Sequence, residues 1–242
     1  MIFWIIAVLL AFFVKGLAGF ANTLVFTSVV GFAADNILIS PVELLLGYPS
    51  NLIMAAKERK AIKWRLCLPL IALMAAGSAA GILFLKNANS GVIKLICAFS
   101  ISAAGVLLFL QTFLQKKIEF SPILLKIVAI VSGILSGLYG IGVLLALYIT
   151  STAADAKSFR ANICTVFFAE NTFRIALYFA TGILTLSALK MFLHLLPFML
   201  IALFLGMKLG EKVSEKTSRR VVALLLVISG AALAVAATRL FM

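Results

Sequence analysis

In this chain of 242 residues, 64% are hydrophobic and only 12% are charged, whereas a soluble domain keeps roughly 25% of its residues charged. The mean hydropathy of +1.21 therefore predicts a polytopic membrane domain and excludes an ordinary soluble one. The net charge of +13 does not indicate nucleic-acid binding, because the basic residues flank apolar segments, a pattern typical of membrane orientation.

Apolar runs of roughly 20 residues, enough to cross a bilayer core about 30 Å thick, follow one another along the chain. The runs predicted to be transmembrane helices are Leu38–Ala56, Leu66–Leu85, Val92–Leu114, Ala161–Thr181, Ala188–Met207 and Val221–Thr238. Two other regions, Ile2–Phe32 and Ile123–Thr150, are too long for one ordinary crossing and too short for two. Both are interrupted by glycines, namely Gly16 and Gly19 in the first and Gly137, Gly140 and Gly142 in the second.

The two interrupted regions match each other, which indicates an internal duplication. An offset of 121 residues places the first two glycines on Gly137 and Gly140, and an offset of 120 places Asn51 on Asn171. Two Gly-xxx-Gly pairs also correspond, and each is most simply a close-packing face between helices: Gly77 with Gly81, and Gly206 with Gly210. We therefore predict one membrane domain made of two repeats, residues 1–115 and 116–242, an architecture common among transporters.

The basic residues distinguish parallel from inverted repeats, because Lys and Arg prefer cytoplasmic loops. If all eight segments are simple spans, the two faces carry ten and nine basic residues, which gives no orientation. If the interrupted regions are re-entrant hairpins, four basic residues lie on one face and fifteen on the other, in the loops at 57–65, 116–126, 157–160 and 208–220. We therefore expect an all-α integral membrane protein of two inverted repeats. Each repeat has a glycine-broken re-entrant or discontinuous helix pair and three transmembrane helices. We also expect a multi-pass protein of the cell inner (plasma) membrane, with both termini outside.

Broken helices expose backbone inside the membrane, which is tolerated only where protein or a water-filled cavity surrounds it. A half-helix that begins near Gly19 or Gly140 points free N–H groups and a positive dipole end at the midplane, a geometry that attracts anions. Two such ends from inverted repeats would face one shared site. The alternative is that these glycines only permit close helix packing.

Charged and amide side chains inside the apolar segments are candidates for that site, because their desolvation is costly. Lys15 either offsets the charge of an anion, or snorkels or pairs with a distant carboxylate. Glu170 and Arg174, four residues apart, form a structural pair, or Arg174 holds an oxyanion with Glu170 as its partner or proton acceptor. Asn22, Asn51 and Asn171 suit hydrogen bonding to oxyanions, although asparagines also tie helices together.

Other polar residues receive structural interpretations. Ser40, Pro41 and Glu43 match a capping box, with Ser40 as the N-cap and Glu43 as its reciprocal partner. Cys67, Cys97 and Cys164 form no metal-binding or disulfide pattern and are expected to be small buried residues. The single histidine, His194, has no ligand cluster around it, so we expect no metal and no cofactor. The absence of a Gly-x-Ser-x-Gly nucleophile also argues against an enzyme.

Several motifs together resemble the TauE/SafE sulfite exporter family over nearly the full chain. They are the glycine-broken openings, the run from Asn51 to Arg65, Phe159-Arg160-Ala161 followed by Asn171-xx-Arg174, and Gly182-Ile-Leu-Thr. The resemblance implies a transporter of small anions, chiefly sulfite, sulfoacetate and other organosulfonates. It implies site roles for Gly137, Gly140, Gly142, Arg160, Asn171 and Arg174. The chain departs from the family at Val143-Leu144-Leu145, where Gly-Pro-Pro is common, at Phe20-Ala21-Asn22, which is poorer in glycine, and at Lys15.

We therefore predict a secondary transporter of a small sulfur-containing or related oxyanion that works by alternating access at a midplane site. Because no nucleotide-binding motif is found, the expected partners are the anion, the bilayer and a proton or ion gradient, with Glu170 as the coupling candidate. A homodimer is left open. The alternatives are a passive anion channel, which differs in showing no saturable, gradient-coupled flux, and a helper subunit without transport activity.

Overall fold

The computed structural model describes residues 1–31, 34, 36–87 and 122–212, with isolated positions at 96, 99, 100, 103 and 106. The described chain is helical and contains no strand, which confirms the all-α prediction. Its longer helices are α3 (Asn36–Lys57), α4 (Trp64–Asn87), α8 (Ala156–Ala180) and α9 (Leu186–Gly210). The remaining elements are α1 (Ile2–Ala18), α2 (Asn22–Val30), α6 (Pro122–Tyr139), α7 (Val143–Thr152) and a 3-10 turn at Arg59–Ala61.

Four helices in the described part of the chain, α3, α4, α8 and α9, are long and apolar enough to cross a membrane. They coincide with four of the predicted spans and begin two to five residues earlier, and α8 ends one residue before the predicted Thr181. The predicted spans Val92–Leu114 and Val221–Thr238 lie outside the described residues, apart from the isolated positions in the first. The predicted boundary between residues 115 and 116 lies outside them as well.

Both glycine-interrupted regions are broken helices. The first break separates α1 from α2, where Gly19 and Ala21 have φ values of 92° and 73°, left-handed values that end a helix. Trp4 of α1 lies against Phe26 of α2 with ring centroids 5.7 Å apart. A continuous helix would separate these residues by about 30 Å, so the chain reverses its direction at this break.

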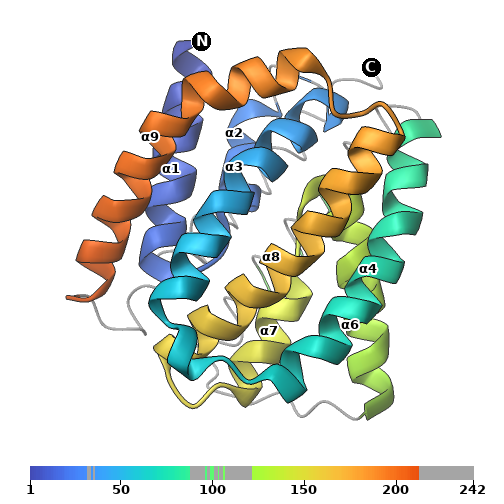
Figure 1. Cartoon of the computed structure of the whole chain (residues 1–242), viewed down its shortest axis with the longest axis vertical. Coiled ribbons are helices and arrows are strands. Elements are labelled where there is room, and N and C mark those ends of the chain that lie inside the picture. The colour runs from blue at the N-terminus through green and yellow to red at the C-terminus, as the bar shows by residue number, and fades with distance from the viewer. Residues whose placement is uncertain are drawn as a thin grey trace.

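The second break separates α6 from α7, and Gly140 within it has a φ of 75°. Figure 1 shows α6 beginning, and α7 ending, at the end of the molecule where α8 begins. In contrast, α1 begins and α2 ends at the opposite end. Each broken pair therefore enters and leaves the bundle at one end, as the hairpin interpretation expects, and the two pairs do so from opposite ends.

The bundle is held together by two glycine-rich helix contacts, α1 with α9 and α4 with α6, on either side of α3 and α8 (Figure 1). A Cβ atom on any of the glycines that form these contacts would collide with backbone of the facing helix, which confirms the two Gly-xxx-Gly packing faces. These glycines are Gly16, Gly206 and Gly210 between α1 and α9, and Gly77, Gly81, Gly133 and Gly137 between α4 and α6. The first helix of each predicted half therefore packs against a helix of the other half, α1 against α9 and α6 against α4. The duplication and its inversion stay predictions.

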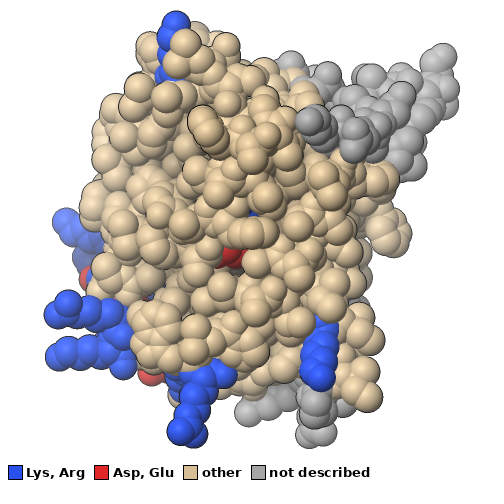
Figure 2. All heavy atoms as spheres, turned by 45° about the vertical axis from the view of Figure 1, so that its right-hand side comes forward, with Lys and Arg blue, Asp and Glu red and all other residues tan. Residues whose placement is uncertain are grey.

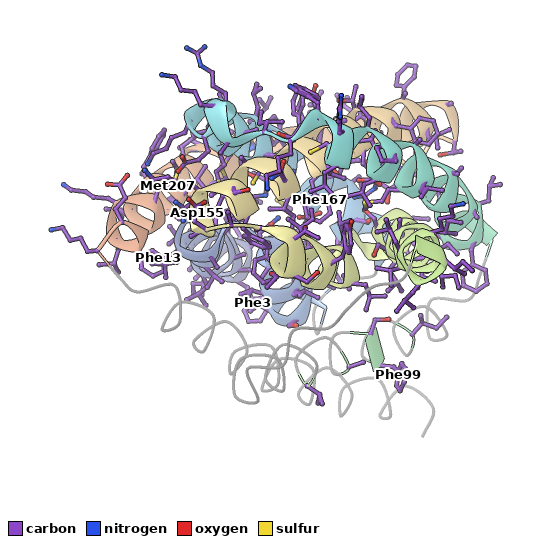
Figure 3. All side chains as sticks on the ribbon, turned by 90° about the horizontal axis from the view of Figure 1, so that it is seen from below. Phe3, Phe13, Phe99, Asp155, Phe167 and Met207 are labelled. Atoms are coloured by element: carbon purple, nitrogen blue, oxygen red, sulfur yellow. The ribbon has the colours of Figure 1, made fainter. Side chains whose placement is uncertain are left out.

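Several basic loops share one end of the molecule. Lys57 Nζ donates to Glu211 Oε1 at 2.6 Å, and Arg160 Nη2 donates to Glu58 Oε1 at 3.2 Å. These bonds join the α3–α4 connection to the end of α9 and to the start of α8. The hydrogen bond from Lys57 also holds the pKa of Glu211 below its usual range. Figure 2 shows Lys and Arg clustered at this lower end beneath a broad band with almost no charged side chain at its surface, and Figure 3 views the molecule from this end. The orientation in the membrane stays a prediction.

Candidate functional site

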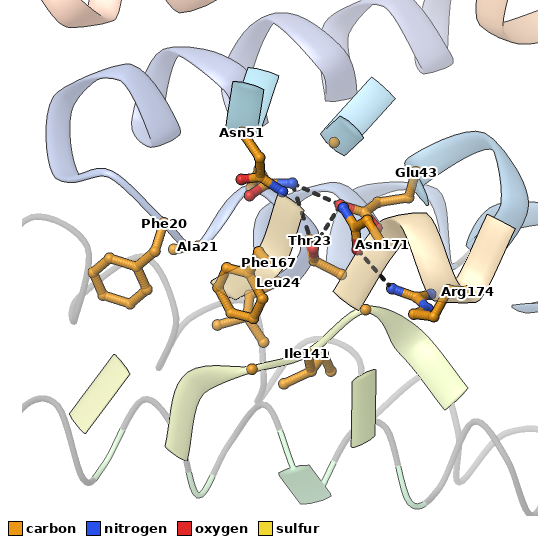
Figure 4. Close-up of a pocket in the computed structure, with 14 residues that line it drawn as sticks. Phe20, Ala21, Thr23, Leu24, Glu43, Asn51, Ile141, Phe167, Asn171 and Arg174 are labelled. Carbon is orange, nitrogen blue, oxygen red and sulfur yellow. Dashed lines mark hydrogen bonds between the residues drawn. The ribbon is translucent and has the colours of Figure 1, made fainter. Parts of the chain in front are cut away.

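A pocket lies where the two helix breaks meet, bounded by the start of α2, the α6–α7 break, and one face each of α3 and α8 (Figure 4). Its free volume is about 30 Å³, room for about two water molecules. The predicted site residues that line it are Asn22, Asn51, Gly140, Gly142, Asn171 and Arg174. Sequence positions as far apart as Asn22 and Arg174 therefore converge on one small polar space.

The start of α2 presents hydrogen-bond donors to the pocket. The first N–H groups of a helix have no partner within it, and here they belong to Asn22 and its neighbours. The Asn22 Nδ2 and Thr23 Oγ1 atoms both donate to Glu43 Oε1, each at 2.6 Å. The carboxylate of Glu43, only 3% exposed, thus occupies the side-chain donors at the positive end of this half-helix.

One face of α3 forms the next wall. Glu43, Gly47 and Asn51 follow one another at intervals of four residues, so they lie along a single stripe of the helix. Lys15 Nζ, which is 2% exposed, donates to Asn51 Oδ1 at 2.6 Å. Because an ammonium group can only donate, Asn51 turns its oxygen toward Lys15, which leaves its Nδ2 donors for the pocket.

A matching face of α8 carries Asn171, Arg174 and Tyr178. Arg174 is 1% exposed and donates from Nη2 to the Tyr178 hydroxyl at 3.2 Å and from Nη1 to Asn171 Oδ1 at 3.5 Å. The Tyr178 hydroxyl in turn donates to the carbonyl of Gly137 at 3.0 Å. The arginine is therefore fixed in place, and it holds Asn171 with its Nδ2 atom free to face the pocket.

Glu170 lies behind Arg174 and does not line the pocket. Its Oε1 atom is 3.8 Å from Arg174 Nε, which confirms the predicted pairing on one helix face. Both side chains are buried, and neither Glu170 oxygen nor Arg174 Nε has a hydrogen-bond partner in the described structure. The contact is thus an ion pair without a hydrogen bond, and the carboxylate is costly to keep charged there.

Besides Glu170, four predicted site residues lie outside the pocket wall. Lys15 acts on it only through Asn51. Gly19 ends α1 but faces the side chain of Arg160, and a Cβ there would lie 2.5 Å from Arg160 Cγ. Gly137 lies within α6, where a Cβ would collide with the carbonyl of Ser78 on α4. Arg160 pairs with Glu58 at the basic end of the molecule, beside a second, smaller cavity.

The capping-box prediction for Ser40, Pro41 and Glu43 is wrong. Helix α3 begins at Asn36, so Ser40 already lies inside it and has no free helix end to cap. The Ser40 hydroxyl instead lies 2.8 Å from the Tyr178 hydroxyl, and Glu43 bonds to α2. A local motif matched, but the apolar residues before it extended the helix by a turn.

The sequence interpretation missed Thr23, Glu43, Gly47 and Phe167 as pocket residues. A signal for two of them was the spacing of Glu43, Gly47 and Asn51, which puts a carboxylate, a gap and an amide on one face of an apolar helix. Phe167 carried no such signal. Its ring fills the space next to Gly142, where a Cβ would collide with it.

The pocket holds a set of groups that can recognise an anion, beside the carboxylate of Glu43. It combines amide donors, two helix starts and a fixed arginine. In the described part of the chain, no group of three or more His, Cys, Asp or Glu residues could hold a metal ion. Cys67 and Cys164 are free and buried, as expected, while Cys97 lies outside the described residues.

Comparison with known proteins identifies the family of the chain. The family model described as sulfite exporter TauE/SafE matches residues 4–233. No curated protein and no solved structure matches the chain. The matched family consists of membrane transporters rather than enzymes, so the resemblance noted from the motifs is confirmed over nearly the whole chain. This chain belongs to the sulfite exporter TauE/SafE family and is a multi-pass membrane transporter.

Proposed function

We propose that this chain is a secondary transporter of a small oxyanion, namely sulfite, sulfoacetate or another organosulfonate, and that the anion binds in the pocket between the two helix breaks. The observation that carries the proposal is the meeting of two half-helix starts with Asn51, Asn171 and Arg174. Such a site offers an anion the N–H groups and the positive dipole ends of two helix starts, together with amide donors.

Within this proposal, Asn51 and Asn171 donate to the anion oxygens through Nδ2, one from each broken-helix repeat. Lys15 and Arg174 orient these two amides, because Lys15 donates to Asn51 Oδ1 and Arg174 donates to Asn171 Oδ1. The pocket opens to the two sides of the membrane in turn as the two hairpin-containing halves move against each other. A proton or ion gradient drives the movement.

The test is anion flux into proteoliposomes that contain the purified protein, measured with labelled sulfite and sulfoacetate with and without a pH gradient. Losing one hydrogen bond to a charged group costs about 1.5–3 kcal/mol. Asn171→Ala should therefore weaken apparent anion affinity by about tenfold to a hundredfold. His194→Gln, a change at an exposed position on α9, is the matched control and should keep wild-type flux.

Arg174→Lys complements that test, because it keeps the charge and removes the planar contacts with Asn171 and Tyr178. Flux that is unaffected in both Asn171→Ala and Arg174→Lys would place the binding site elsewhere. A passive channel is the alternative, and flux that rises linearly with concentration and ignores the applied gradient would establish it instead.

A further inference from the structure

We propose that Glu43 is the proton site of this transporter, and that it takes up one proton as the anion enters the pocket. The inference rests on the proposed function and adds the coupling chemistry to the same pocket. It assigns to Glu43 the role for which the sequence alone had suggested Glu170.

The first argument is geometric competition. Glu43 Oε1 occupies the Asn22 amide and the Thr23 hydroxyl, which are side-chain donors that an oxyanion at the start of α2 would use. Asn171 Nδ2 and Glu43 Oε1 both lie 3.5 Å from where a Cβ of Gly47 would stand, so the carboxylate reaches the space between α3 and α8 too. Figure 4 shows Glu43, Thr23 and Asn171 pointing toward one another across the pocket.

The second argument is space. The free volume of about 30 Å³ admits about two waters, which is less than a sulfite or a sulfonate group needs. A side chain must therefore move when the anion binds. Glu43 is the candidate, because its Oε2 already fills the space that a side chain at position 140 would need: a Cβ there would lie 2.6 Å from Oε2.

The third argument is charge. Among the described residues, the buried charged side chains are Lys15, Glu43, Glu170 and Arg174, whose formal charges cancel. From α8, Arg174 and Glu170 act electrostatically on Glu43, and from α1 so does Lys15; its neighbours on α2 and at the α6–α7 break, Asn22, Thr23 and Gly140, carry no charge. A bound anion adds a negative charge to this balanced set in a medium of low polarity, where uncompensated charge is costly.

Protonation of Glu43 restores the balance and removes the competition at once. A proton from the aqueous phase, passed on through water in the pocket, binds the carboxylate. The neutral carboxyl loosens its hold on Asn22 and Thr23, and those donors turn to the anion. When the anion leaves, Glu43 releases the proton to the same side and bonds again to Asn22 and Thr23. Glu170 does not line the pocket and stays the counter-charge of Arg174.

The experiment measures anion and proton movement together in proteoliposomes that hold a trapped pH-sensitive dye. The main probe is isethionate, whose sulfonate keeps one negative charge at all pH values used, whereas sulfite itself titrates near neutral pH. Sulfite and sulfoacetate are run beside it. Wild-type protein should move about one proton with each isethionate, and its apparent affinity should fall about tenfold for each pH unit above the midpoint.

Three carboxylate-to-amide variants separate the roles. Glu43→Gln keeps the size and the acceptor oxygen of the side chain, so it should still move isethionate while losing proton movement and the pH dependence of affinity. Glu170→Gln can change the rate of transport, but the number of protons moved with each anion should equal that of wild type. Glu211→Gln, at an exposed position at the end of α9, should behave as wild type in both measurements.

The outcomes distinguish this inference from the proposed function. If wild-type protein moves isethionate without protons, or if Glu43→Gln keeps the wild-type ratio, the inference is overturned and the transport proposal stands. If Glu170→Gln loses the protons instead, Glu170 is the proton site. If wild-type protein moves none of the three anions, both proposals fail together.

Thr23→Val covers the case in which Glu43→Gln does not fold. It removes one donor to the charged carboxylate, so Glu43 should accept its proton more readily and the midpoint of the pH profile should move upward. A midpoint equal to that of wild type would overturn the inference as well.

Discussion

A substitution at Gly140 would add a single Cβ atom to the pocket, next to the carboxylate of Glu43. The Gly140 φ of 75° is a left-handed value that costs a non-glycine residue about 1–2 kcal/mol, and an added Cβ would lie 2.6 Å from Glu43 Oε2. Gly140→Ala therefore combines a backbone cost with pressure on a carboxylate that two short hydrogen bonds hold in place. We expect the backbone cost to lower stability by about 1–2 kcal/mol. The displaced carboxylate should change apparent anion affinity by about tenfold, the equivalent of one hydrogen bond to a charged group at about 1.5 kcal/mol.

Gly182 supplies the matched control. Its φ is 74°, nearly that of Gly140, but a Cβ there would have nothing within 4 Å. Gly182→Ala should show a similar loss of stability in detergent, measured by heating and size-exclusion chromatography, and should keep wild-type apparent affinity in the liposome assay. The reasoning is refuted if Gly182→Ala impairs affinity as much as Gly140→Ala does, or if Gly140→Ala leaves affinity unchanged.

Other regions of the fold give further predictions. Gly137→Ala should destabilise the protein by about 1–3 kcal/mol, because its methyl group would press on the Ser78 carbonyl and separate α4 from α6; melting in detergent measures this, and an unchanged melting temperature would contradict the packing. Cysteines placed at Lys60 and Lys212 should be labelled by an impermeant thiol reagent from the same side of the membrane, since Lys57 and Glu211 form one ion pair; labelling from opposite sides would refute the shared basic end. The pKa of Glu211 is lowered by Lys57, so the contribution of this pair to stability is complete above the usual glutamate pKa and is lost as the pH falls through the lowered value. Glu211→Gln should therefore reduce the dependence of the melting temperature on acid pH, and a slope equal to that of wild type would argue against the pair.

The sequence predicted the helix breaks because glycines that interrupt two apolar runs at a fixed offset indicate one structural feature made twice. It also predicted Asn51, Asn171 and Arg174, because a polar group in an apolar helix must find a partner or a cavity. These three residues do line the pocket. The same reasoning could not tell the glycines apart, and Gly137 turned out to be a packing residue while Gly140 and Gly142 line the pocket.

Glu43 shows why the remaining part of the site could not be predicted. Ser40-Pro41-Val42-Glu43 has the letters of a helix start, and only the tertiary structure shows that α3 begins at Asn36. The sequence could not place Arg160 for the opposite reason. The family motif drew attention to it, but its long side chain reaches Glu58 at the basic end rather than the pocket. In both cases the deciding contact joins helices that are distant in sequence.

The pairing of α1 with α9 has a consequence for biosynthesis. The glycine face of α1 is made first, yet its partner Gly206 lies almost 200 residues later in the chain. Until α9 is made, α1 must stay in the membrane without its native neighbour. If synthesis stopped before Leu186, α1 would never obtain that neighbour. The slow step of assembly is therefore expected to be the arrival of α9, which closes the contact with α1.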